Sequence, residues 1–290
     1  MKNFFAPQFL NFKFYDMLFE SMKNFPDMFR KDCKIVTLYG CFPGMKWNAG
    51  RIEHNRVQLS ENKVRGLFEF YKHYNMPLTI TATKQNMTPE LLEDEYCHMI
   101  MRLTLEYNGA VLVANKELEN LLRQRYPDLK LHCSILQTEF RPYNLDGYAI
   151  SVLDVDKNKE WDFLNTIPIE DRDRIEILVN ECCDKNCPKR FDHYRYMSKC
   201  DETGVQAQPW CALERSVCGF ARRKKNGIYI SPDELDNYVK AGFNKFKLIG
   251  RGHLYSLFQS IAEYLGEPEY YDDIMRSFVL WSWNNNQKEN

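Results

Sequence analysis

The 290-residue chain has no apolar run long enough to cross a bilayer, and residues 1–7 contain no sustained apolar segment with a small-residue cleavage site. It also has no excess of charge. Its 39 Lys and Arg residues against 40 Asp and Glu residues give a net charge of -1, so no global attraction to nucleic acid or to an anionic membrane is expected. These absences predict a soluble, cytoplasmic protein whose thiols stay reduced.

Cysteine, in contrast, is abundant, with ten residues, and its densest group is Glu181-Cys182-Cys183-Asp184-Lys185-Asn186-Cys187-Pro188. In a reducing compartment such thiols are more commonly ligands or core residues than disulfides. The group directly follows a run at 174–180 that is typical of a buried strand. A thiol cluster at a strand end indicates metal or iron–sulfur ligation, because thiolates are soft ligands and the strand holds them in place.

Short β-rich runs recur along the chain, separated by segments with helical periodicity. Val64, Leu67, Phe68 and Tyr71 form one apolar stripe at helical spacing. Ser231-Pro232-Asp233-Glu234 predicts a capping box at the start of a helix that Gly242 follows. Several of the runs are continuously apolar, as in parallel strands buried on both faces. The predicted strands are 35–42, 78–82, 110–114, 129–135, 148–155, 174–180, 227–230 and 246–249.

Roughly eight β/α units in a chain of this length predict the α/β class and a TIM-type (β/α)8 barrel, which usually takes about 250 residues. Any distortion is expected at the fifth unit, since 137–147 has little helical pattern. The alternative, an open doubly wound sheet, lacks a glycine-rich phosphate loop after its first strand. The predicted parts are a helical lead-in over 1–34, a barrel over 35–265 with a cysteine loop at 181–218, and a C-terminal helix with a disordered tail over 266–290.

In such a barrel the chemistry lies at the C-terminal ends of the strands. That face would collect the polar and thiol-bearing residues that follow each predicted strand: Cys41, Thr83, Asn115, Cys133, Ser134, Asp154, Asn180, Cys183, Arg251 and His253.

Several segments, taken in order, resemble a known family. They are 37–40 with 48–51, 109–115 with 126–134, 175–180 leading into Cys183, 208–211, and 242–251. From about residue 35 to His253 the chain resembles the collagenase-like peptidase family U-32. The resemblance implies a barrel of this kind; the family includes nominal peptidases and iron–sulfur proteins that support oxygen-independent hydroxylation of RNA bases or quinone precursors.

Two departures from the family pattern bear on function. The spacing of Cys183 and Cys187 is tighter than the usual first pair, and Ile249 replaces the glutamate of the family's closing Lys-Ile-Glu-Gly-Arg strand. Any chemistry done by that carboxylate is therefore lost here or supplied from elsewhere. The chain is expected to be a divergent member whose substrate cannot be inherited.

The predicted ligand set is Cys183, Cys187 and Cys211 with a fourth thiol. The resemblance points to Cys41, and Cys200 and Cys218 are the alternatives. A 4Fe–4S cluster accepts such irregular spacing, whereas structural zinc, the alternative cofactor, usually shows a second tight cysteine pair. A set of unligated thiols is the remaining interpretation.

Arg251 and His253, in the loop after the last strand, are the predicted catalytic residues. Arg251 would orient an anionic substrate by paired hydrogen bonds, or else it pairs with a loop carboxylate. His253 is either a ligand contact or a cap at the start of the last helix. The basic run 221–226 would contact phosphate if the substrate were RNA, although a solvated loop is the commoner role.

The predicted function is redox or oxygen-independent hydroxylation chemistry beside an iron–sulfur cluster, with an unknown substrate and an electron donor as partners. One alternative is a peptidase-like hydrolase with structural or zinc-binding cysteines. The other is a non-catalytic barrel that binds a partner at its rim.

Overall fold

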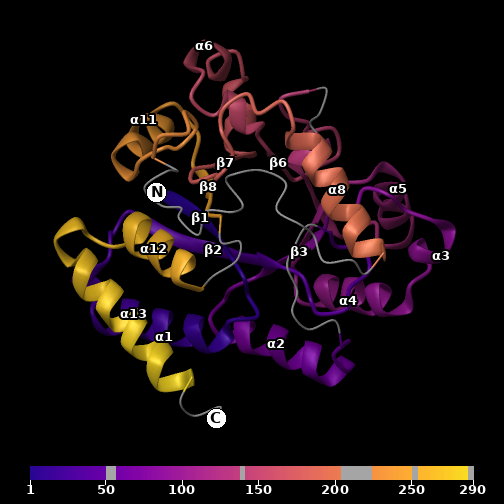
Figure 1. Ribbon diagram of the computed structural model, residues 1–290, viewed down its shortest axis with the longest axis horizontal. Coiled ribbons are helices and arrows are strands. Elements are labelled where there is room, and N and C mark those ends of the chain that lie inside the picture. The colour runs from indigo at the N-terminus through magenta and orange to yellow at the C-terminus, as the bar shows by residue number, and fades with distance from the viewer. Residues whose placement is uncertain (50–56, 138–140, 204–223, 250–253, 287–290) are drawn as a thin grey trace.

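The computed structural model forms a closed barrel of eight parallel strands in sequence order, β1 to β8 (Figure 1). It describes residues 1–49, 57–137, 141–203, 224–249 and 254–286. The predicted TIM-type (β/α)8 barrel is therefore confirmed. The strands are β1 Lys2–Pro7, β2 Cys33–Gly40, β3 Leu78–Ala82, β4 Ala110–Val113, β5 Lys130–Cys133, β6 Ile150–Val152, β7 Ile175–Leu178 and β8 Lys245–Lys247.

Helices surround the barrel, and short 3-10 turns join some of them to the strands (Figure 1). The helices are α1 Phe12–Asn24, α2 Glu61–His73, α3 Pro89–Leu92, α4 Glu95–Glu106, α5 Lys116–Arg125, α6 Trp161–Leu164, α7 Ile169–Arg172, α8 Arg190–Thr203, α11 Leu235–Lys240, α12 Leu254–Leu265 and α13 Tyr271–Asn286. The 3-10 turns are η1 Pro26–Met28, η2 Ile135–Gln137, η3 Val155–Lys157, η4 Pro232–Glu234 and η5 Pro268–Tyr270.

The first strand was missed, so the prediction of a helical lead-in over 1–34 is wrong for residues 2–7, whereas α1 does lie within that range. Residues 2–7 form β1, which pairs with both β2 and β8 and thereby closes the barrel. The strand was not predicted because it begins with a charged residue, Lys2. The Lys2 ammonium is accommodated by ion pairs to Asp32 at 2.7 Å and to Asp236 at 2.8 Å.

The predicted strand at 227–230 is also wrong. Ile228, Tyr229 and Ile230 are all buried, which explains the apolar run, and the Ile230 N–H donates to the Val179 carbonyl at 2.9 Å. Residues 227–230 pair with no strand among the described residues. The segment therefore packs beside the end of β7 without joining the sheet, and β1 supplies the eighth strand.

Local signals at the helix ends are confirmed. Ser231 and Glu234 form a capping box, and Gly242, which follows the helix, has a φ of 97° that favours glycine. The weak fifth unit is confirmed as well, because only the 3-10 turn η2 is recorded between β5 and β6 among the residues described there.

The C-terminal helix predicted within 266–290 is α13, which lies beside α12 and α1 (Figure 1). Rings from these helices meet at Phe14 and Phe278, 5.2 Å apart, and at Phe258 and Phe278, 5.3 Å apart. The helix continues to Asn286, so a tail disordered from residue 284 is wrong for 284–286, and 287–290 lie outside the described residues.

The protein has two packed regions: the interior of the barrel, and the larger core between the strands and the helices. Contacts between strands that are not neighbours identify the interior. The Phe5 ring on β1 lies 6.3 Å from the His132 ring on β5. The Lys247 ammonium on β8 lies 4.3 Å from the centre of the Tyr39 ring on β2. Because β1 separates β8 from β2, this second contact reaches across the inside of the barrel. The interior is thus partly polar and charged.

Within the described part of the chain, no helix combines the length and the apolar character that a membrane span requires.

Candidate functional site

A cavity of about 80 Å³ lies at the C-terminal ends of the strands, where this type of barrel places its chemistry. Its walls come from strand ends and from the loops that follow them, and Tyr194 of α8 borders it. The described lining residues are Pro7, Tyr39, Ala49, Thr81, Thr83, Leu112, Ser134, Ile135, Leu136, Val152, Leu178, Glu181, Tyr194, Lys247 and Ile249.

A buried ion pair underlies the cavity. Lys247 Nζ lies 2.6 Å from Glu176 Oε1, and these side chains are 8% and 1% exposed. The ammonium also lies over the ring of Tyr39, whose hydroxyl donates to the Leu248 carbonyl. The cavity thus has a cation whose position is fixed by a carboxylate and an aromatic face.

Hydroxyl groups form one polar wall of the cavity. Thr81 Oγ1 and Thr83 Oγ1 both donate to Asn48 Oδ1, at 3.0 and 3.3 Å. Directly after β5, Ser134 Oγ accepts from the Leu136 N–H at 3.3 Å. These groups can offer hydrogen bonds to a polar substrate.

The cysteine loop, here residues 181–187, follows β7 and begins at the cavity. Glu181 lines the cavity, and its Oε1 accepts from the N–H groups of Cys182 at 2.6 Å and Cys183 at 3.3 Å. Asn226 Nδ2 donates to the Glu181 carbonyl at 2.6 Å, and the Lys185 N–H donates to the Asn226 carbonyl at 2.9 Å. The loop is therefore tied both to the cavity wall and to the segment around Asn226.

Cys183 and Cys187 are half-buried and close to one another. Burial raises the pKa of Cys183 to about 12, the neighbouring Arg190 guanidinium acts in the opposite direction, and Glu181 and Cys187 raise it further. A thiol with such a pKa is protonated at neutral pH and is a weak nucleophile, whereas a bound metal ion would favour its thiolate. None of the eight cysteines in the described ranges forms a disulfide.

Two of the residues predicted on the rim, Thr83 and Ser134, do line the cavity. Cys133 does not line it; its side chain is fully buried in the main apolar core. Asn115 instead caps α5 by accepting from the Leu118 N–H at 2.9 Å. Asn180 joins Ser260 Oγ, at 2.9 Å, to the Ile249 N–H, at 2.6 Å, and so braces β8.

Among the predicted ligands, Cys183 and Cys187 lie on the same loop, and the charge of Cys187 acts on Cys183. Cys41 is buried in the main apolar core, and Cys200 is buried on α8. No group of three or more His, Cys, Asp or Glu side chains suited to a metal ion occurs within the described residues. Cys41 therefore does not form such a group with the pair.

The remaining predicted site residues, Cys211, Cys218, Arg251 and His253, lie outside the described residues.

Three functional-site groups were not predicted from the sequence: the Lys247–Glu176 pair, Glu181 and Arg190. A signal was present for the pair, since Glu176 and Lys247 each interrupt an apolar strand. Charges at such positions are seldom buried without a partner, and each predicts the other. Arg190 has no comparable signal, because its partners are set by the fold.

Comparisons with known proteins add a limited match. No protein-family model matches the chain. Over 109 residues it is 29% identical to an uncharacterized protease, MJ1657, from Methanocaldococcus jannaschii. That match covers 37% of this chain, and the chain spans about a third (32%) of the relative's length.

Among solved structures, that of the U32 peptidase Mk0906 is similar with a TM-score of 0.49 and 12% identity, covering 87% of this chain and 94% of that one. The closed barrel and the match to a curated relative agree with the resemblance that the ordered motifs indicate. Over about a third of its length this chain is thus similar to a protein described as a protease, and its fold is a closed eight-stranded barrel.

Proposed function

We propose that this chain is a barrel enzyme of the U32 type in which cysteines of the loop after β7 hold a 4Fe–4S cluster beside the cavity. The observation that carries the proposal is the pairing of Cys183 and Cys187 on a loop whose first residue, Glu181, lines that cavity. Ligands on this loop would bring a cluster close to a substrate in the barrel mouth.

The donor chemistry of the loop fits such a group. Two half-buried thiols without a disulfide suit iron–sulfur ligation, and a cluster takes its ligands from separate loops. A complete set needs further thiols; Cys211 is the proposed third ligand and Cys218 the fourth, because Cys41 and Cys200 form no metal-ligand group with the pair among the described residues. When bound, the cluster would supply or accept electrons or act as a Lewis acid, in redox or hydroxylation chemistry served by an electron donor.

The residues of the cavity would bind and orient the substrate. Lys247 offers a fixed positive charge, Glu181 a carboxylate, and Thr81, Thr83 and Ser134 offer hydroxyl groups. Arg251 and His253 are proposed to add contacts to an anionic group from the loop after β8. The hydroxyl groups and the fixed cation favour a polar substrate.

A second candidate, a peptidase-like hydrolase with zinc or structural cysteines, is favoured by the similarity to a relative described as a protease. A Cys183 nucleophile is disfavoured, because burial raises its pKa to about 12. A cysteine nucleophile also needs a base, and the described lining residues of the cavity include no histidine.

Contact with RNA is not part of the proposal. Residues 221–223 of the basic run lie outside the described ranges. Lys224 pairs with Glu263 at 2.8 Å, so its charge is already matched within the protein.

The test is metal and sulfide analysis of protein purified without oxygen, together with a peptide-cleavage assay with and without a chelator. Iron and acid-labile sulfide in similar amounts, with no cleavage, are expected. Zinc without sulfide and chelator-sensitive cleavage would instead favour the hydrolase. Protein with neither iron nor sulfide would refute the cluster.

A further inference from the structure

A buried guanidinium lies behind the cysteine loop. Arg190, in the first turn of α8, is only 4% exposed. Its Nη1 and Nη2 donate to the two carboxylate oxygens of Asp156 at 2.7 and 2.9 Å. Nη2 also donates to the Asp184 carbonyl at 2.8 Å. One planar group thus connects the η3 turn after β6 to the middle of the cysteine loop.

The same carboxylate holds the loop directly. Asp156 Oδ1 accepts from the Asn186 N–H at 2.7 Å. Burial by itself would raise the pKa of Asp156, but the hydrogen bonds from Arg190 and from the Asn186 N–H outweigh it and lower the pKa. The Asp154 carboxylate lies 3.7 Å from Arg190 Nη1, so the guanidinium faces two acidic groups. The loop is therefore anchored by charge-assisted hydrogen bonds in addition to its contacts with Asn226.

The positive charge of the guanidinium also acts on the nearby Cys183 thiol and works to lower its pKa, against the larger effect of burial. The guanidinium Nε is buried and has no hydrogen-bond partner. A buried donor without a partner carries a free-energy cost that a ligand can remove. Arg190 thus anchors the loop and also has an N–H group, at Nε, that is available to donate a hydrogen bond near the proposed ligand Cys183.

We propose that Arg190 is the positioning residue of the cysteine loop: it fixes the Cys183 sulfur through Asp156 and Asp184, and it stabilises negative charge on a group bound there. Only the second half of this inference, the stabilisation of negative charge on a bound group, rests on the proposed function. Arginine suits the role because its planar fork spans two carboxylate oxygens and a carbonyl, which a lysine ammonium cannot do with the same geometry. Partners that orient metal ligands in this way affect affinity and reduction potential.

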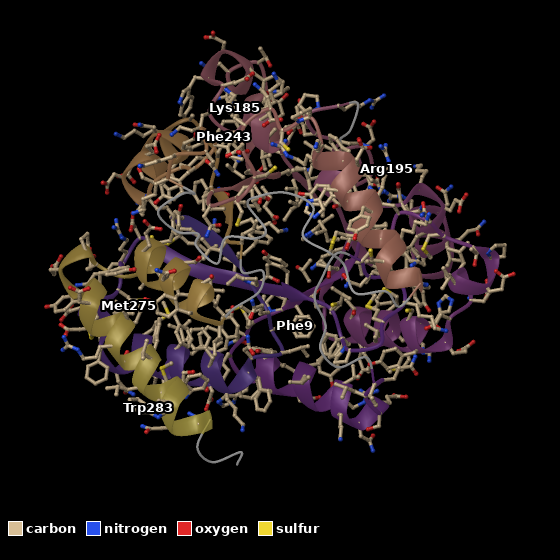
Figure 2. All side chains as sticks on the ribbon, viewed as in Figure 1. Phe9, Lys185, Arg195, Phe243, Met275 and Trp283 are labelled. Atoms are coloured by element: carbon tan, nitrogen blue, oxygen red, sulfur yellow. The ribbon has the colours of Figure 1, made fainter. Side chains whose placement is uncertain are left out.

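The experiment compares Arg190→Lys with wild type, and Arg195→Lys is the matched control. Arg195 lies on the same helix (Figure 2), is 51% exposed and pairs with Asp192 at 3.1 Å. The first readout, hydrogen exchange of the apo protein, needs no metal. Exchange of the Asn186 amide should become about tenfold faster in Arg190→Lys. The substitution holds Asp156 less firmly, and so it weakens the hydrogen bond from the Asn186 N–H to the Asp156 carboxylate. The control should leave it unchanged.

The second readout uses Co²⁺ alone as a probe of the thiol ligands. Affinity, followed by the thiolate-to-cobalt absorption, should fall about 10- to 100-fold in Arg190→Lys, as for other changes beside metal ligands. The third readout is the midpoint potential of protein purified without oxygen. Loss of a donor near the sulfur should disfavour reduction about tenfold, a shift of ~59 mV to more negative values for a one-electron couple.

The outcomes separate the two proposals. Unchanged exchange at Asn186 overturns the positioning role, whatever the metal content of the protein. Faster exchange with unchanged Co²⁺ affinity and potential overturns the second half of the inference. Absence of iron and sulfide from wild type refutes the proposed function and leaves the exchange result standing. If Arg190→Lys does not fold, Asp156→Asn weakens the same anchor while keeping the guanidinium, and the same exchange result is required.

Discussion

The packed barrel and the cysteine loop both contain cysteines and buried charges, but the two regions hold them differently. In the barrel, Cys133 is fully buried among apolar side chains, and Lys247 pairs with a single carboxylate inside the strands. In the loop, Cys183 and Cys187 are half-buried, and Arg190 is shared between carboxylates and a loop carbonyl. The difference indicates packing and a rigid cavity floor in the first region, and positioned thiols in the second.

The largest effect is expected from breaking the charge pair in the barrel. Lys247→Met leaves the Glu176 carboxylate, 1% exposed, without its cation, and should lower the free energy of unfolding by about 3–5 kcal/mol. The double variant Lys247→Met with Glu176→Met removes both charges and should recover most of that loss. Urea unfolding measures both. A single variant as stable as wild type would show that the pair does not hold the interior.

Serine substitutions test whether the two kinds of cysteine differ as described. Cys133→Ser buries a hydroxyl in the apolar core and should cost about 1–3 kcal/mol in the free energy of unfolding. Cys187→Ser, in the half-buried loop, should change the stability of the apo protein by no more than about 0.5 kcal/mol. Thermal or urea unfolding of the two variants gives the comparison. Equal losses of unfolding free energy in the two variants would show that the barrel and loop cysteines do not differ in this way.

The buried His132 inside the barrel should make the free energy of unfolding depend on pH. Burial, together with the charges of Lys247, Lys245 and Lys130, lowers the pKa of His132 to about 3. Because the unfolded chain takes up this proton near pH 6.5 and the folded protein does not, stability falls as the pH decreases from about 6.5 towards about 3.

His132→Gln should therefore reduce the slope of unfolding free energy against pH in that window by up to about 1.4 kcal/mol per pH unit. Urea unfolding at a series of pH values measures the slope. An unchanged slope would mean that His132 is protonated in the folded protein.

The fold could largely be predicted from the sequence because buried parallel strands leave mostly apolar runs, as in Ala110–Val113. The misses have physical causes. The strand Lys2–Pro7 begins with a charged residue that is matched only through the fold. The segment 227–230 has the burial of a strand without the pairing.

The candidate site was less predictable. The thiol pair stands out in the sequence because Cys183 and Cys187 are close along the chain. The partners that position them come from distant segments: Asp156 lies 34 residues from Arg190, and Asn226 lies 45 residues from Glu181. Such contacts follow from strand order and loop geometry, and no local sequence pattern predicts them.

The central claim is that the loop cysteines bind a cluster and the barrel cysteines pack. It is tested most directly by iron and sulfide content in Cys183→Ser, Cys187→Ser and Cys133→Ser, purified without oxygen beside wild type. The account predicts about four iron and four sulfide per chain in wild type. It predicts the same content in folded Cys133→Ser and a marked loss in both loop variants. Equal content in all four proteins, or none in wild type, would contradict it.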